Sequence, residues 1–219
     1  MKKFFLIGND IQKSLSPKIH NVIYREYGIK ASYDLFQIKN VDEIKNLTNV
    51  SDGFNVTAPF KSQIISFLTN LNLDIDSVNT VTVTMNGKKL TGYSTDGKGF
   101  ILDAIRLGLN LERVFIVGTG GAAKSIVHEL KKIGIGFSVY NKQNDIKKEI
   151  KKIKPTLIIN ATPAKFYLDN IYDLKYNDYE GMSGIGMLIY QAILSAEIFL
   201  NIKIDLKIFS KIIGELNEN

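Results

Sequence analysis

The sequence predicts an α/β protein with two parallel or mainly parallel sheets, and three observations lead to this prediction. Short apolar segments alternate with segments of helical periodicity along the first half of the chain. A second series of strands and helices begins near Arg113, and glycines follow its first strand directly. The tail from about Met187 is helical throughout. Strands that alternate with helices form sheets with helices on both faces, and we expect the tail to pack back on the first domain.

Composition excludes several classes of protein. The chain has 219 residues, of which 45% are hydrophobic and 23% charged, as is typical of a globular protein. It has no cysteine, which favours a reducing compartment, and we expect a cytoplasmic protein. The two histidines lie far apart in sequence, which argues against a zinc site, and the apolar run ending at Gly8 is too short for a signal or a membrane span. The net charge is +6, but the lysines are dispersed without an aromatic–basic motif, so we expect no nucleic-acid partner.

The first strand is expected at Phe4–Ile7 and a helix follows it. Ser16 at the N-cap and Pro17 at the first helical position are typical start signals, and Gly28 ends the helix. The next expected elements are a strand over residues 33–38, a weak helix over 41–47 and a strand over 53–56.

A corner at the end of this third strand is the first candidate site. Pro59 cannot continue a strand, so the chain turns there, and Lys61 is expected to open an amphipathic helix. Partial desolvation at such a corner lowers a lysine pKa toward the working pH, which suits a general acid or base. The alternative is an ordinary surface lysine at a helix start.

Three further polar positions in the first half have two interpretations each. Ser14 and Ser16 flank Leu15 and can bind a carboxylate at a helix start, or act only as turn and capping serines. Asp96, after a hairpin with an Asn86-Gly87 turn signal, can hold Lys61 in its charged form or only cap the next helix. His20 is interpreted as a packing or capping residue.

The second half contains a βαβαβ unit with a glycine fingerprint. Gly118, Gly120 and Ala123 fit G-x-G-x-x-A between a strand and a helix, where backbone N–H groups and the helix dipole bind a pyrophosphate. The alternative is a glycine-rich turn in a unit that binds nothing. The second strand ends in Tyr140-Asn141-Lys142-Gln143 without an acid, and Lys142 can meet a 2′-phosphate, which favours NADP over NAD; Lys142 as a solvated loop residue is the other possibility.

An ordered set of motifs resembles the shikimate dehydrogenase family over nearly the whole chain. They are Ser14-Leu15-Ser16-Pro17 with His20-Asn21, Gly53-Phe54-Asn55-Val56-Thr57 with Pro59 and Lys61, Ser77-Val78-Asn79-Thr80, Gly92 to Gly99, Gly118 to Ala123, Asn160-Ala161-Thr162-Pro163, and Gly184 to Leu188 with Gln191. The resemblance implies reversible NADPH-dependent reduction of 3-dehydroshikimate to shikimate, in the pathway to chorismate and the aromatic amino acids.

The resemblance also implies a division of labour along the chain. A substrate domain would comprise residues 1–97 and 187–219, and a shortened Rossmann-like NADP domain residues 98–186. Lys61 and Asp96 would be the catalytic pair. Substrate would be held by Ser14, Ser16, Thr57, Asn79, Asp96, Tyr176 and Gln191. Cofactor would be held by Gly118, Thr119, Gly120, Gly121, Ala122, Ala123, Asn141, Lys142, Thr162, Gly184 and Met187.

The chain departs from the family pattern in three places. Ser94 replaces the usual asparagine, and Asn141-Lys142-Gln143 replaces N-R-T, which exchanges a planar guanidinium for a point charge and predicts a weaker preference for NADP. The segment between Asn177 and Gly184 is shorter than in the family. Two alternatives therefore stay open: a quinate/shikimate dehydrogenase of broader specificity, and a low-activity regulatory protein that binds shikimate or NADP. Both a monomer and a homodimer are compatible with the sequence.

Overall fold

The computed structural model describes residues 1–71, 76–84, 89–140, 146–176 and 182–218. The backbone forms two compact units, Met1–Thr95 with Ile189–Asn219, and Asp96–Leu188. The predicted α/β class is confirmed. None of the helices in the described ranges has the length and apolar character that a membrane span requires.

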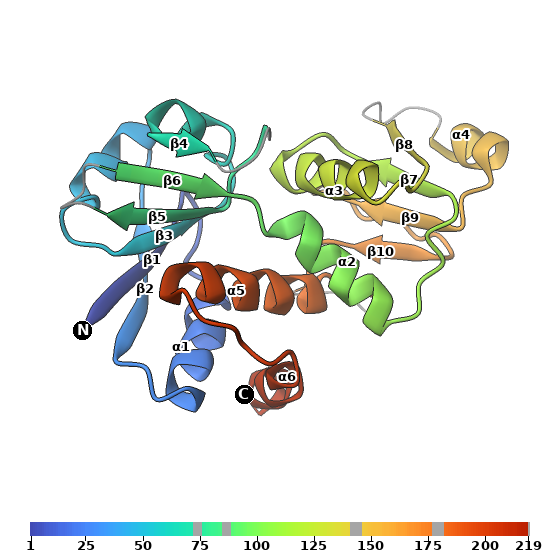
Figure 1. Cartoon of the computed structure of the whole chain (residues 1–219). Coiled ribbons are helices and arrows are strands. Elements are labelled where there is room, and N and C mark those ends of the chain that lie inside the picture. Colours follow the sequence, from blue (N-terminus) through green and yellow to red (C-terminus); the bar gives the residue numbers. More distant parts are fainter. Residues whose placement is uncertain (72–75, 85–88, 141–145, 177–181, 219) are drawn as a thin grey trace. The chain divides into compact units, whose positions relative to one another are not determined.

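The first unit is built on a mixed six-stranded sheet of order β2-β1-β3-β5-β6-β4 (Figure 1). Strands β1, β2 and β3 are mutually parallel, whereas β5 runs antiparallel to β3 and β6. Its elements are β1 Lys2–Gly8, α1 Ser16–Glu26, β2 Ala31–Gln37, η1 Val41–Asn46, β3 Gly53–Val56, η2 Gln63–Phe67, β4 Asn70–Leu71, β5 Thr80–Thr84, β6 Lys89–Tyr93, most of α5 Ile185–Leu200, and α6 Ile208–Asn217.

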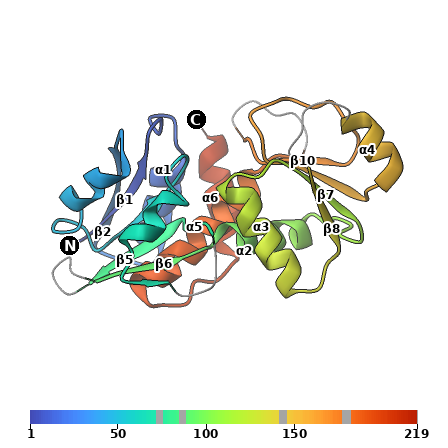
Figure 2. The same ribbon diagram turned by 90° about the horizontal axis from the view of Figure 1, so that it is seen from above.

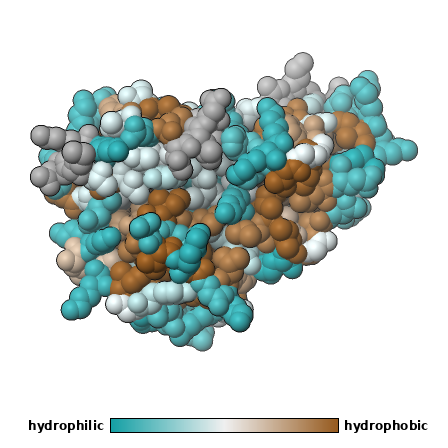
Figure 3. Space-filling view, in the orientation of Figure 1, coloured by the Kyte–Doolittle hydropathy of each residue, from teal (hydrophilic) through white to brown (hydrophobic). Residues whose placement is uncertain are grey.

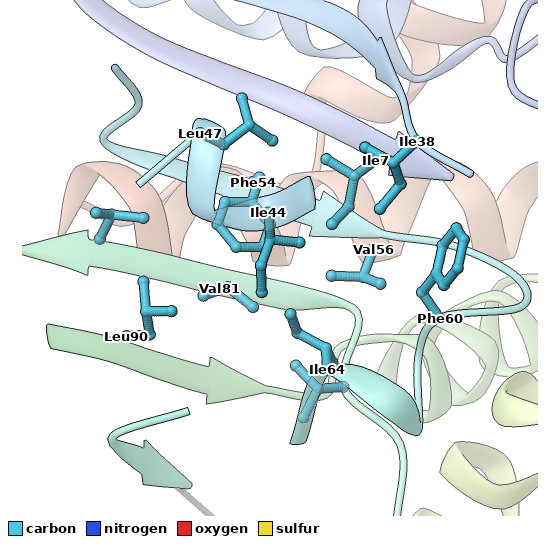
Figure 4. Close-up of a cluster of buried hydrophobic side chains, with 12 residues drawn as sticks. Ile7, Ile38, Ile44, Leu47, Phe54, Val56, Phe60, Ile64, Val81 and Leu90 are labelled. Carbon is cyan, nitrogen blue, oxygen red and sulfur yellow. The ribbon is translucent and has the colours of Figure 1, made fainter. Parts of the chain in front are cut away.

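Side chains alternate between the two faces of this sheet. On one face Phe4 stacks on Phe199 of α5 with ring centroids 4.6 Å apart, and a Cβ at Gly53 would lie 2.9 Å from the same ring, so glycine lets α5 approach the sheet. On the other face Phe54 and its neighbours pack against Ile44 of η1 and Ile64 of η2 (Figure 4). Each sheet face thus has its own apolar layer.

Two local expectations in this unit are wrong. Leu15, not Ser16, occupies the N-cap of α1, and no side chain caps it; instead Ser14 Oγ accepts the N–H of Ser16 at 3.2 Å. Lys61 opens no α-helix, because its carbonyl oxygen accepts the N–H of Val78 at 2.9 Å and is not available to continue a helix. A short 3₁₀ helix, η2, follows instead. The expected turn at Asn86-Gly87 lies outside the described residues.

The second unit has a four-stranded parallel sheet of order β10-β9-β7-β8. Helices α2 and α3 pack on one face of it and α4 on the other (Figure 2). Its elements are α2 Asp96–Arg106, β7 Val114–Val117, α3 Gly121–Lys132, β8 Phe137–Tyr140, α4 Ile146–Ile153, β9 Leu157–Asn160, β10 Ile171–Asp173 and the start of α5.

The strand order shows where this unit is short. In a complete dinucleotide-binding sheet the third strand lies outside the second. Here the third strand, β9, pairs with the other side of β7, and β8 is the edge strand among the described residues. The family motifs indicate a shortening only between Asn177 and Gly184. Among the described residues, the strand order indicates a second place, between β8 and β9.

The surface mixes polar and apolar residues, and the face in Figure 3 carries several hydrophobic areas between hydrophilic ones. Ile105 of α2 is 70% exposed and Tyr167 is 92% exposed. Such residues are common on globular proteins and mark no site by themselves.

Candidate functional site

One edge of the six-stranded sheet gathers the loops that carry most predicted substrate residues. The carboxyl ends of β1 and β3 lie there because the two strands are parallel. Strand β5 begins at this edge and β6 ends at it, since Thr80 pairs with both Asn55 and Tyr93. Loops that lie far apart in sequence therefore meet at one place.

Ser14 and Ser16 lie together after β1. Ser14 donates a hydrogen bond to the hydroxyl of Ser16 at 3.2 Å, while its own oxygen accepts the N–H of Ser16. Ser16 is buried and Ser14 is half-buried. The pair forms a small polar surface at the start of α1.

Thr57 and Lys61 follow β3 at the same edge. The N–H of Thr57 donates to the carbonyl of Ile7 at 2.9 Å, which ties this corner to the end of β1. The carbonyl of Lys61 accepts the N–H of Val78, next to Asn79. Lys61 is half-buried, as the corner interpretation expects.

Asn79 and Gln191 contact each other directly. Asn79 Oδ1 accepts the backbone N–H of Thr95 at 2.7 Å. Asn79 Nδ2 donates to Thr95 Oγ1 at 2.7 Å and to Gln191 Oε1 at 3.1 Å. Both amides are buried, so their orientation is set by these bonds. The two predicted substrate residues thus form one unit.

His20 is a packing residue. Its ring is fully buried and stacks on Tyr33, and its Nδ1 lies 3.4 Å from the hydroxyl of Tyr24. The expectation of a packing role is confirmed by this contact.

Asp96 and Tyr176 belong to the second unit. Asp96 is the first residue of α2 and is buried. Tyr176 follows β10 and is half-buried.

The glycine turn of the second unit has the form of an anion-binding loop. Gly118 has a φ of +112°, and a Cβ there would lie 2.9 Å from the carbonyl oxygen of Ala161. Gly120 is the N-cap of α3, has no capping side chain, and would place a Cβ in open space. Uncapped N–H groups at a helix start, beside room for a ligand, fit a pyrophosphate.

Residues around this turn have different surroundings. Thr119 is exposed, Gly121 and Ala122 are half-buried, and the side chain of Ala123 packs in the core between α3 and the sheet. Ala123 therefore allows close helix packing, as the third position of the fingerprint requires.

Thr162 lies beside the glycine turn. A Cβ at Gly118 would be 2.9 Å from its methyl group. Its N–H and hydroxyl both donate to Asn160 Oδ1, at 3.0 and 2.8 Å, and Asn160 Nδ2 donates to Asp173 at 2.8 Å. Sequence reasoning did not single out Asp173, although it is a buried acid at a strand end.

The remaining predicted cofactor residues divide into two groups. Gly184 is buried, with room for no Cβ because the carbonyl of Leu174 would be 2.5 Å away, and Met187 packs in the core of the second unit. Asn141 and Lys142 lie outside the described residues.

The chain is similar to known proteins along its whole length. Residues 6–81 match the family described as shikimate dehydrogenase substrate binding domain. The shikimate dehydrogenase (NADP(+)) of Pyrococcus furiosus is 30% identical, with 96% of this chain and 94% of the relative covered. Its alignment spans 261 positions, more than the length of this chain, so the relative contains residues that this chain lacks.

Solved structures share the fold. Shikimate dehydrogenase 1 from Peptoclostridium difficile is 29% identical with a TM-score of 0.81, and 99% of this chain and 98% of that chain are covered. The enzyme of Thermus thermophilus, solved in complex with NADP(H) and shikimate, is 20% identical with a TM-score of 0.83 over 97% and 98% of the two chains, which supports the fold alone.

Proposed function

The chain belongs to the shikimate dehydrogenase family, and from this membership we propose that it interconverts 3-dehydroshikimate and shikimate with NADP(H). The observation that carries the proposal is the Asn79–Gln191 contact at the sheet edge where the Ser14–Ser16 pair also lies. Buried amides and paired hydroxyls suit a small ligand with several hydroxyl groups and a carboxylate. We further propose that residues 1–97 and 187–219 bind the substrate and residues 98–186 bind the cofactor, in the cytoplasm.

Ser14 and Ser16 would hold the substrate carboxylate. Their hydroxyls are 3.2 Å apart, and α1 begins at Ser16, so the helix dipole adds to the attraction of an anion. Tyr176 would also lie near this carboxylate. Thr57, Asn79 and Gln191 would bind the ring hydroxyls, together with Asp96.

Lys61 would move the proton. Reduction of the ketone generates an alkoxide, and the ammonium of Lys61 donates a proton to it; in oxidation the neutral amine accepts the proton of the hydroxyl. Asp96 would favour the charged form of Lys61 and orient it. Lysine suits this task because it can exist in both protonation states, unlike arginine.

The glycine turn and the start of α3 would bind the pyrophosphate of NADP. Bound NADPH supplies the hydride, and the protein's task is to align it with the ketone. Gly118–Gly120 allow the backbone to approach the phosphates, and Thr162 would border the same site. The backbone at Gly184 and Met187 would lie near the nicotinamide. Asn141 and Lys142 would meet the adenosine 2′-phosphate, with a weaker preference for NADP than an arginine confers.

The first test is NADP reduction with shikimate, followed by NADPH absorbance, beside parallel reactions with quinate and with NAD. Turnover with shikimate and NADP supports the proposal. Equal turnover of quinate would instead identify an enzyme of broader specificity, and a preference for NAD would overturn the cofactor assignment.

The small size of the second unit favours one further candidate function. Because β8 is an edge strand among the described residues, the cofactor half is smaller than in a complete dinucleotide-binding sheet. A shikimate-binding protein with little turnover would show a raised melting temperature with shikimate but no NADPH formation. The retention of Lys61 and Asp96 favours the enzyme.

A further inference from the structure

A buried polar network lies between the six-stranded sheet and α5. Its members are at most 8% exposed, and they come from β3, the residue just before β5, β5 itself, the segment after β6, and α5. The members are Asn55, Asn79, Thr80, Thr95, Gln191 and Ser195. Because buried polar groups are costly unless satisfied, such a network fixes side-chain positions.

Backbone groups determine the orientation of both asparagine amides. Thr95 N–H can only donate, so the atom of Asn79 that it meets at 2.7 Å is the oxygen. The carbonyl of Asn79 can only accept, so the atom of Asn55 that it meets at 2.8 Å is the nitrogen. These two backbone groups therefore set the hydrogen-bond polarity of the network.

The orientation of the Asn79 amide also sets the direction of its hydrogen bond to Gln191. The two N–H bonds of Asn79 are directed to Thr95 Oγ1 and Gln191 Oε1. Asn79 Oδ1, which accepts the N–H of Thr95, has a second lone pair and is an acceptor, and the amide nitrogen of Gln191 is a donor. A hydroxyl group, which both donates and accepts, matches such a pair better than a carbonyl group does.

Ser195 links α5 to the sheet side of the network. Its hydroxyl lies 3.0 Å from Asn55 Nδ2, 2.7 Å from Thr80 Oγ1 and 3.2 Å from Thr95 Oγ1. It is four residues after Gln191 on α5, so the two side chains share one face of the helix. Ser195 is fully buried, and its three partners belong to the sheet side of the network.

We propose that Ser195 and Thr80 are positioning residues for substrate specificity. They hold Thr95 in the position from which it orients Asn79, and through Asn79 the amide of Gln191, toward a ligand hydroxyl. This inference rests on the proposed function, since it takes Asn79 and Gln191 as substrate residues. Neither Ser195 nor Thr80 needs to touch the substrate itself.

A matched pair of variants at position 80 separates hydrogen bonding from packing. Thr80→Val keeps the β-branched shape and the strand propensity but removes the hydroxyl, whereas Thr80→Ser keeps the hydroxyl and removes a methyl group. We expect Thr80→Val to raise KM for shikimate about fivefold, the value of one ordinary hydrogen bond. Thr80→Ser should restore most of the lost affinity, and KM for NADP should stay constant in both.

Ser195→Ala provides a second test at the other end of the same contact, with a residue that suits a helix. It should raise KM for shikimate in the same way, whereas Ile193→Val, a buried change on the same helix outside the network, should not. A normal KM for shikimate in both Thr80→Val and Ser195→Ala would overturn the inference. A rise of KM for shikimate in Thr80→Ser and Ile193→Val as large as that in Thr80→Val would also overturn it.

Different results refute the proposed function and the positioning role of Ser195 and Thr80. A wild-type protein that neither oxidises shikimate nor gains melting temperature from it refutes the proposed function, and the inference with it. A wild-type enzyme whose hydroxyl variants keep its shikimate KM refutes the inference alone. Melting temperature measured beside the kinetics identifies a variant that has lost its fold.

Discussion

The imidazole ring of His20 lies parallel to the phenol ring of Tyr33, with 3.9 Å between the ring centroids and an interplanar angle of 5°. His20 is fully buried. Burial lowers the pKa of His20 from 6.5 to about 3, because an imidazolium there would lose its hydration. The ring is therefore neutral in the folded protein near neutral pH.

The lowered pKa of the buried His20 predicts a loss of stability in mild acid. Below pH 6.5 the unfolded chain protonates His20, but the folded chain does not until about pH 3, so the unfolded state binds more protons in this window. The free energy of unfolding should fall as pH falls, by about 1.4 kcal/mol per pH unit from this residue, or roughly 2 kcal/mol at pH 5. Urea unfolding at a series of pH values measures this slope.

The source of the slope is tested with His20→Phe, which keeps an aromatic ring beside Tyr33 and removes the titrating group. Its unfolding free energy should depend less steeply on pH between 6.5 and 4. His128→Gln, measured beside it, gives the part of the slope that the other histidine contributes. An unchanged slope in His20→Phe would show that other groups cause the acid sensitivity.

Local patterns in the sequence predict much of this fold but not how far-apart segments meet. The glycine turn was predictable because strand, glycines and helix follow one another between Val114 and Lys132. The 3₁₀ helix after Lys61 was not predictable. The carbonyl of Lys61 accepts a hydrogen bond from the N–H of Val78, which is distant in sequence. The strand order was equally hidden, since a strand that crosses to the other side of β7 has the same local pattern as one that does not.

In the candidate site, too, contacts between segments far apart in sequence were not predictable from local patterns. Asn79 and Gln191 were predicted from the family resemblance, and no periodicity would have paired them across the chain. Ser195 was missed because a single serine in an apolar helix gives no signal, and its meaning depends on Asn55 and Thr80 opposite it.

Gly120 offers a test of the cofactor site that leaves the fold intact. Its backbone has φ −70° and ψ 179°, which alanine adopts freely, and a Cβ there meets no atom within 4 Å. In Gly120→Ala the methyl group should occupy the space proposed for the pyrophosphate. We expect KM for NADP to rise about tenfold or more, with an unchanged melting temperature and KM for shikimate.

Gly118→Ala is the matched comparison. Gly118 has a φ of +112°, and a Cβ would press against Ala161, so this variant should lose roughly 1–3 kcal/mol of stability. Thermal unfolding beside NADP titration separates the two glycines. A wild-type NADP KM in Gly120→Ala would place the cofactor elsewhere.

Ser14→Ala tests the proposed carboxylate site. The variant removes one hydroxyl of the Ser14–Ser16 pair and the acceptor for the N–H of Ser16, so a small loss of stability, about 1 kcal/mol, accompanies it. KM for shikimate should rise about tenfold while KM for NADP stays constant, since a hydrogen bond to a charged group is stronger than a neutral one. If both KM values stay normal, the carboxylate binds at another place.

Lys61 gives the most direct test of the proton transfer. Lys61→Ala should lower kcat for shikimate oxidation by about 10²–10⁴, the usual contribution of a general acid or base, with little change in melting temperature because the side chain is only half-buried. Lys30→Ala, an exposed lysine just before β2 and thus at the opposite edge of the sheet, is the control and should keep wild-type rates.

Lys61→Arg distinguishes charge from proton transfer. Arginine keeps the positive charge but cannot give up its proton, so it cannot accept one from the substrate hydroxyl. If Lys61 is the general base of the oxidation, Lys61→Arg should be nearly as slow as Lys61→Ala, and both should still show a melting temperature raised by NADP. If Lys61→Arg instead restores most of the rate, the residue acts through its charge, and the proton must leave by another group at the same edge of the sheet.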